Sequence, residues 1–191
     1  MIDTVTIKKM LAIGDSITYG FPYDPACSWV NLVSRQIHTP IANRGICGET
    51  TGDMLDRFES EIAAHKAEVV IITGGSNDAY FGISVPDLVA NLSEMLTLSR
   101  RSGLIPVIGL PPPIIGREEA RLAEYRQSLR GLAAEFSAPI LDFYLPFVDT
   151  EGGHIRTGLL VDEVHPNLAG YAAMAEVAQL LLGGLNDAVD R

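Results

Sequence analysis

The sequence predicts one α/β domain in three layers, with a five-stranded parallel sheet between two layers of helices. Short apolar runs rich in β-formers alternate along the chain with longer segments whose apolar residues recur at helical spacing. The short runs are apolar at nearly every position, as is typical of strands buried on both faces of a parallel sheet. The 191 residues contain no internal repeat, low-complexity tract or linker, so residues 1–191 are expected to form a single domain.

The predicted elements follow one another in strict alternation. Strands are expected at residues 10–13, 40–43, 69–73, 105–110 and 139–143. A short helix is expected at 28–37, and four longer ones are indicated by apolar stripes within 54–62, 88–96, 122–136 and 168–182. Because each strand of a parallel pair needs a crossover to the next, helices between the strands are the expected connection.

Charge and leader signals exclude several classes of function. The chain has 14 lysine and arginine residues against 24 aspartate and glutamate residues, for a net charge of −10, and its basic residues do not cluster. A nucleic-acid or anionic-membrane partner is therefore not expected. The N-terminal residues lack a basic start followed by an apolar stretch, and no run of about 18 apolar residues occurs. We expect a soluble, cytoplasmic protein without stable membrane insertion.

The two cysteines give no sign of a disulfide framework or a metal site. Cys27 and Cys47 are too few for the first and are not paired at metal-binding or redox spacing. They are expected to be reduced, small apolar residues. No cofactor or metal is predicted.

Polar residues gather where the predicted strands end. The first strand runs into Gly14-Asp15-Ser16, the second into "NRGICGETTGDM" and the third into "GGSND". After the fifth strand and a loop comes "LLVDEVHPNLAGY". Ligands of open parallel sheets bind at the carboxyl ends of the strands, so these polar groups are expected on one edge.

Ser16, His165 and Asp162 have the residue types of a nucleophile, its base and the carboxylate that orients the base. A serine hydroxyl is a weak nucleophile until a nearby base takes its proton. The three-residue spacing from Asp162 to His165 lets the carboxylate reach one ring nitrogen and leaves the other free for Ser16. Pro166 suits the first position of a helix, so His165 is expected at the mouth of the last helix, where the dipole favours neutral imidazole.

Acyl transfer also needs donors for the developing oxyanion. Gly48 allows close approach of its backbone N–H, Asn77 offers a side-chain amide, and the backbone N–H of Ser16 would be the third donor. Taken singly, each of these residues has a plain structural alternative: Ser16 as a helix cap, Asp162 as a turn residue, and Asn77 as a loop amide. Asp15 and Asp78 are expected to hold loop backbone.

Four segments together resemble the SGNH hydrolases, also called the GDSL family of esterases and lipases. They are "GDSITYG", "GICGETT", "GGSND" and "DEVHPN", and the resemblance spans residues 10–182. It implies a flavodoxin-like sheet with strand order 2-1-3-4-5. It also implies Ser16 as nucleophile, Gly48 and Asn77 as oxyanion donors, and Asp162 with His165 as the rest of a triad acting on a small-molecule ester.

Rival functions are weaker on these residues. The chain lacks a phosphate-cradling first loop, a P-loop and the Gly-x-Ser-x-Gly elbow of α/β-hydrolases. A metal-dependent hydrolase would need more histidines near Asp162 than this chain offers. An inactive flavodoxin-like binding module is the remaining non-enzyme alternative.

The substrate is the least determined part of the prediction. Pro112, Ile114 and Leu160 lie in the loops long enough to shape an acyl pocket, and they are expected to line it for short-to-medium acyl chains. Carbohydrate O-acetyl esters, lysophospholipids and thioesters are alternative substrates for the same mechanism. The segment 145–161 carries no motif, and oligomeric state is not predicted.

Overall fold

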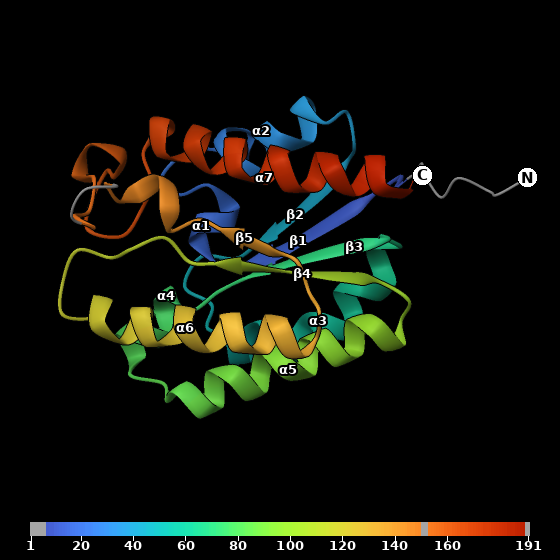
Figure 1. Ribbon diagram of the computed structural model, residues 1–191, viewed down its shortest axis with the longest axis horizontal. Helices are drawn as coiled ribbons and strands as arrows, with labels where there is room; N and C mark the ends of the chain where they lie inside the picture. The colour runs from blue at the N-terminus through green and yellow to red at the C-terminus, as the bar shows by residue number, and fades with distance from the viewer. Residues whose placement is uncertain (1–6, 150–152, 190–191) are drawn as a thin grey trace, which may run out of the picture.

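The computed structural model describes residues 7–149 and 153–189, and its centre is a parallel sheet with strand order β2-β1-β3-β4-β5 (Figure 1). The strands are β1 (Met10–Gly14), β2 (Ile41–Gly45), β3 (Val69–Thr73), β4 (Ile105–Leu110) and β5 (Ile140–Asp142). Gly14, at the end of β1, is in register with Gly45 on one side and Thr73 on the other. The predicted fold class and strand order are confirmed.

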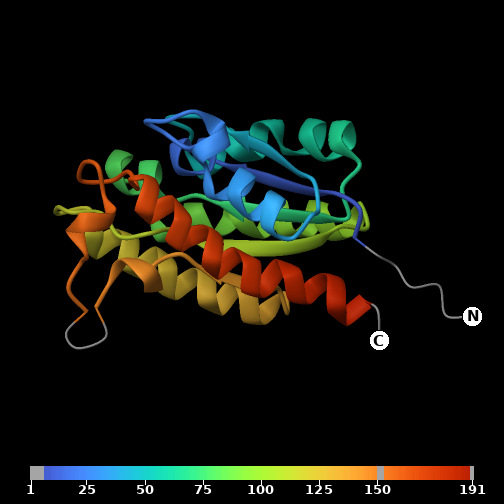
Figure 2. The same cartoon turned by 90° about the horizontal axis from the view of Figure 1, so that it is seen from above.

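Side chains of each central strand alternate between two buried clusters. In β1, Leu11 and Ile13 join one cluster, whereas Met10 and Ala12 join the other. The first cluster is covered by α3 (Thr51–His65), α5 (Val85–Arg101) and α6 (Glu119–Glu135), and the second by α2 (Trp29–Gln36) and α7 (Leu168–Val189). Figures 1 and 2 show these two helical layers on opposite sides of the sheet. The period of two along each strand thus produces the three-layer architecture.

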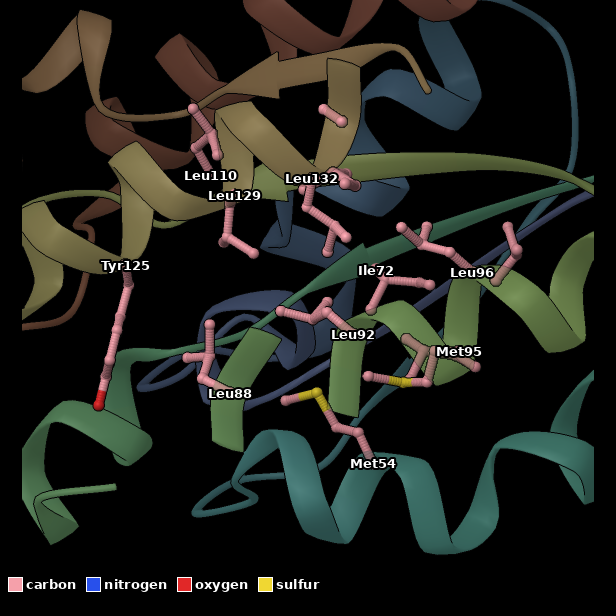
Figure 3. Packing of buried hydrophobic residues seen from close by; sticks show 14 of the residues in the cluster. Met54, Ile72, Leu88, Leu92, Met95, Leu96, Leu110, Tyr125, Leu129 and Leu132 are labelled. Atoms are coloured by element: carbon pink, nitrogen blue, oxygen red, sulfur yellow. The ribbon is translucent and has the colours of Figure 1, made fainter. Parts of the chain in front are cut away.

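The apolar stripes of the sequence are the buried faces of these helices. Figure 3 shows the packing between the sheet and the first helical layer, where Ile72 of β3 lies among leucine and methionine side chains of α5. Leu88, Leu92, Met95 and Leu96 are almost fully buried there. Helices at positions 28–37, 54–62, 88–96, 122–136 and 168–182 are therefore confirmed.

Five short elements were not expected from the sequence. They are α1 (Ser16–Tyr19), α4 (Ser76–Phe81) and three 3₁₀ turns, η1 (Pro25–Cys27), η2 (Leu145–Phe147) and η3 (Thr157–Leu159). A helix of one or two turns is too short to show apolar periodicity. Capping chemistry determines α1 instead: Asp15 accepts the N–H of Ile17 at 2.9 Å, and Gly20 ends the helix at φ +113°.

The start of α7 differs from the expectation for Pro166. The proline does not open the helix but forms an isolated antiparallel bridge with Leu160. Asn167 caps the helix, because its Oδ1 accepts the N–H groups of Ala169 and Gly170 at 3.0 Å each. His165 therefore lies in the turn ahead of the helix and not on its first turn, and Asp162 holds its backbone N–H and its ring.

Length and composition alone would allow α7 to cross a membrane, since residues Leu168–Leu185 have a mean hydropathy of 1.4. A third of that window is buried, 33%, and its buried side chains belong to the second core cluster. Tyr171, Met174 and Ala178 are fully buried against the sheet. Such packing is usual for a core helix of a globular domain.

Candidate active site

The polar ends of the strands meet in one cavity at the carboxyl edge of the sheet. Its volume is about 710 Å³. Ser16 reaches it from α1, Asn77 from α4, Ile115 from the segment after β4, and His165 from the turn before α7. The lining residues are Ser16, Ser76, Asn77, Tyr80, Phe81, Ile115, Asp162, Glu163, Val164 and His165.

The tight junction between β1 and α1 holds Ser16 in the lining of the cavity. Asp15 caps the helix, so the serine is its first residue rather than its cap, and the serine is 8% exposed. Gly45, at the end of the neighbouring strand, makes room for this junction. A Cβ there would lie 2.2 Å from the backbone nitrogen of Tyr19, so only glycine fits.

His165 links Ser16 to Asp162. Its Nε2 lies 3.1 Å from Ser16 Oγ, and its Nδ1 lies 2.8 Å from Asp162 Oδ2. The other oxygen of Asp162 accepts the backbone N–H groups of His165, at 2.7 Å, and Val164, at 2.8 Å. The carboxylate therefore fixes both the backbone turn and the imidazole ring.

The charge state of Asp162 follows from these bonds. Desolvation raises its pKa, but the hydrogen bonds from His165 and Val164 outweigh this effect, and the pKa lies below its ordinary value. The ring of Phe21 covers the imidazole, with centroids 4.6 Å apart. Tyr171 donates its hydroxyl to the Phe21 carbonyl at 2.7 Å and so supports that ring from α7.

The structure places two of the three expected oxyanion donors, Ser16 and Asn77, at the cavity. Ser16 and Asn77 line the cavity, and Asn77 Nδ2 donates one hydrogen bond to the carbonyl of Glu49 at 2.8 Å. An amide nitrogen carries two hydrogens, so one remains for another acceptor. Gly48 precedes Glu49 and has φ +87°, a conformation that favours glycine, although it is not among the cavity-lining residues of the described chain.

Two buried carboxyl groups hold the loops around the serine, as the sequence predicts. Asp78 accepts the N–H of Thr51 at 3.1 Å and its hydroxyl at 2.5 Å, joining α4 to α3. Burial raises the pKa of Asp78 despite these bonds. Burial likewise raises the pKa of Asp15 to about 7, against the hydrogen bond from Ile17 and with a smaller contribution from Asp78.

The residues predicted to line the acyl pocket are not among the residues that line the cavity. Pro112, Ile114 and Leu160 are buried, and the last two belong to the core clusters on opposite faces of the sheet. Apolar surface at the cavity comes instead from Tyr80, Phe81, Ile115 and Val164. Sequence reasoning missed Tyr80 because α4 itself was missed. Ile115 is the half-buried neighbour of Ile114.

Comparison with known families shows which family the chain belongs to. The model of the GDSL-like lipase/acylhydrolase family matches residues 12–173, which is most of the chain. The chain belongs to this family. The match includes every segment that brings a residue to the cavity.

Individual relatives within the family agree with this placement. The chain is 27% identical over 177 residues to the esterase TesA of Pseudomonas aeruginosa, covering 88% of this chain and 85% of that protein. It is also 27% identical to the thioesterase 1/protease 1/lysophospholipase L1 of Escherichia coli K12, covering 83% and 75%. A solved G-D-S-L family lipolytic protein from Desulfitobacterium hafniense superposes with a TM-score of 0.84 at 29% identity, covering 91% and 98%.

Proposed function

We propose that the protein hydrolyses carboxylic esters of small molecules through an acyl-enzyme on Ser16. The observation that carries the proposal is the continuous line from Asp162 Oδ2 to His165 Nδ1, at 2.8 Å, and from His165 Nε2 to Ser16 Oγ, at 3.1 Å. Both distances are hydrogen-bond distances, which is the geometric requirement for a base-activated serine. The acylhydrolase family gives independent support.

In the acylation step, Ser16 Oγ attacks the ester carbonyl carbon while His165 Nε2 takes the hydroxyl proton. The electron pair of the carbonyl moves to its oxygen, and the tetrahedral intermediate is stabilised by N–H donors of Ser16, Gly48 and Asn77. Asp162 supports the imidazolium. The intermediate collapses, the bond to the alcohol oxygen breaks, and His165 returns the proton to that oxygen.

Deacylation repeats these events with water. His165 takes a proton from water, the hydroxide equivalent attacks the acyl carbon, and the bond to Ser16 Oγ breaks as His165 protonates the serine. The products are a carboxylic acid and the free enzyme. No step needs a metal or an organic cofactor.

The cavity favours short-to-medium acyl chains. Tyr80, Phe81, Ile115 and Val164 offer apolar surface within the same cavity as Ser16, enough for a few methylene groups. Each buried methylene contributes up to ~0.8 kcal/mol, or about fourfold in kcat/KM. Thioesters and lysophospholipids are alternative substrates, because one relative is named both a thioesterase and a lysophospholipase. Carbohydrate O-acetyl esters require the same chemistry at the carbonyl.

Covalent labelling tests the nucleophile. A fluorophosphonate should add one adduct to the folded protein, mapped by mass spectrometry to Ser16, and Ser16→Ala should abolish both the adduct and the hydrolysis of p-nitrophenyl acetate. Heat-unfolded protein is the control for non-specific reaction. Labelling at another residue would reject Ser16, and a folded protein without label or turnover would favour the inactive binding module.

A further inference from the structure

Arg57 of α3 lies behind the loop that follows β2, and its side chain is only 15% exposed. Its Nε is 2.9 Å from both carboxylate oxygens of Glu49, and its Nη2 is 2.7 Å from Glu49 Oε2. The same Nη2 donates to the carbonyl of Arg44 at 2.8 Å and lies 3.4 Å from the carbonyl of Gly14. One guanidinium therefore joins the ends of β1 and β2 to the loop between β2 and α3.

That loop carries one proposed oxyanion donor, Gly48, and the support of another, because the carbonyl of Glu49 holds Asn77. Gly48 immediately precedes Glu49 in the chain. The carbonyl of Glu49 accepts the hydrogen bond from Asn77 Nδ2 at 2.8 Å, which fixes the rotation of the Asn77 amide. The carboxylate and the carbonyl of Glu49 thus face two different partners, Arg57 on one side and Asn77 on the other.

We infer that Arg57 is a positioning residue for the oxyanion hole, acting through Glu49 on the Gly48 backbone and the Asn77 amide. The inference rests on the proposed function, since it concerns the donors that function requires. A donor displaced by about 1 Å can cost roughly 10²-fold in rate, so a residue without contact to substrate can affect catalysis strongly. Gly14 adds a second route, because it lies two residues before Ser16.

The opposite side of Arg57 is held by a second carboxylate. Arg57 Nη1 is 3.3 Å from Glu61 Oε1, and Arg44 contacts the same carboxylate through Nε at 2.7 Å and Nη2 at 2.8 Å. The contacts to Glu49, Glu61 and the Arg44 carbonyl use three separate guanidinium nitrogens, whereas a lysine would have to make them from one nitrogen on a flexible stem. The rigid fork of arginine suits this position.

A double-mutant cycle with Asn77 tests the inference, with kcat and KM measured on p-nitrophenyl acetate. Asn77→Ala should lower kcat by roughly 10²–10³, the loss typical of one oxyanion donor. Arg57→Ala should lower kcat by about 10–100-fold with less than about threefold change in KM. In the Asn77→Ala background, Arg57→Ala should cost only a few-fold, because part of its effect passes through the missing amide. Arg57→Lys should recover part of kcat.

Arg44→Ala is the matched control. It removes an arginine from the same Glu61 carboxylate, yet its side chain makes no bond to the 46–49 loop among the described residues. Its kcat should stay within about twofold of the parent protein. If Arg57→Ala does not fold, Glu49→Gln keeps the test open, since it weakens the Arg57 contact and retains the Glu49 carbonyl; several-fold loss of kcat is expected.

The outcomes separate this inference from the proposed function. Fully additive losses in the cycle would overturn the route from Arg57 to Asn77. An unchanged kcat in Arg57→Ala, or a loss confined to KM, would overturn the whole positioning role while leaving the serine mechanism intact. An unchanged kcat in Asn77→Ala would instead reject Asn77 as a donor of the oxyanion hole proposed above.

Discussion

Asp15, the residue before Ser16, is a buried carboxyl group that the proposed chemistry does not use. Asp15 is 2% exposed, and its Oδ1 accepts the N–H of Ile17. Burial raises its pKa from 3.8 to about 7. Between these two values the folded protein binds more protons than the unfolded chain, so the contribution of Asp15 to stability falls as pH rises.

Asp15→Asn should therefore stabilise the protein increasingly between pH 4 and pH 7. Asparagine retains an oxygen for the Ile17 N–H and cannot ionise, so it removes a destabilisation that reaches up to about 4 kcal/mol above pH 7. Urea unfolding at pH 5, 6, 7 and 8 measures the difference in unfolding free energy between variant and parent. Parallel pH profiles would contradict the raised pKa.

At the scale of elements, α4 combines two tasks on fewer than two helical turns. Asn77 on its first turn faces the Glu49 carbonyl, while Tyr80 and Phe81 at its end form part of the cavity wall. Gly75 ahead of the helix has φ +120°, so the chain turns sharply from β3 into α4. Replacing Phe81 changes the wall without disturbing the core, because this ring is 70% exposed.

An ester panel should show this division of tasks. On p-nitrophenyl esters the parent protein should gain kcat/KM from acetyl towards hexanoyl, by at most about fourfold per methylene, and then level off or decline. Phe81→Ala should flatten that gain and leave acetyl turnover nearly unchanged, since the acetyl group has too little surface to reach the ring.

Leu180→Ala serves as the comparison variant, because Leu180 is an 83% exposed apolar residue of α7 outside the cavity. It should preserve the whole profile. A kcat/KM that keeps climbing from six to sixteen carbons in the parent protein would require a longer acyl groove than the cavity described above.

At the scale of the whole molecule, the parallel sheet decides where the chemistry lies. All five strands point the same way, so the polar segments that follow them meet at the carboxyl edge of the sheet. The two faces of the sheet are covered by apolar core clusters. Across residues 7–149 and 153–189, no group of three or more His, Cys, Asp and Glu side chains is arranged to hold a metal ion. The proposed mechanism relies on His165 as its general base.

Hydrolysis should accordingly persist after prolonged incubation with EDTA and gel filtration into metal-free buffer. The rate on p-nitrophenyl acetate, measured before and after, should agree within error, because proton transfer to His165 needs no metal-bound water. Loss of activity that returns on adding a divalent cation would count against the triad mechanism.

The sequence by itself determined the layers, the strand pattern and the residues that meet at the sheet edge. Short runs that are apolar at nearly every position identify the buried strands, and apolar residues at helical spacing identify the helix faces. The motifs after the strands identify Ser16, Asn77, Asp162 and His165. Ser16 follows β1 and His165 follows β5, so the parallel sheet predicts both at its carboxyl edge, although they are 149 residues apart in the chain. The path of the loop after β5 brings the two side chains within 3.1 Å of each other.

Tertiary structure alone decided which side chains face the cavity. Ile114 and Ile115 are adjacent and equally apolar, but only Ile115 lines the cavity while Ile114 enters the core, because the loop path after β4 sets their directions. The contacts of Arg57 could not be predicted for the same reason, because its partners Gly14, Arg44 and Glu49 come from three segments. Loops without periodicity take their conformation from such long-range contacts, which no local pattern encodes.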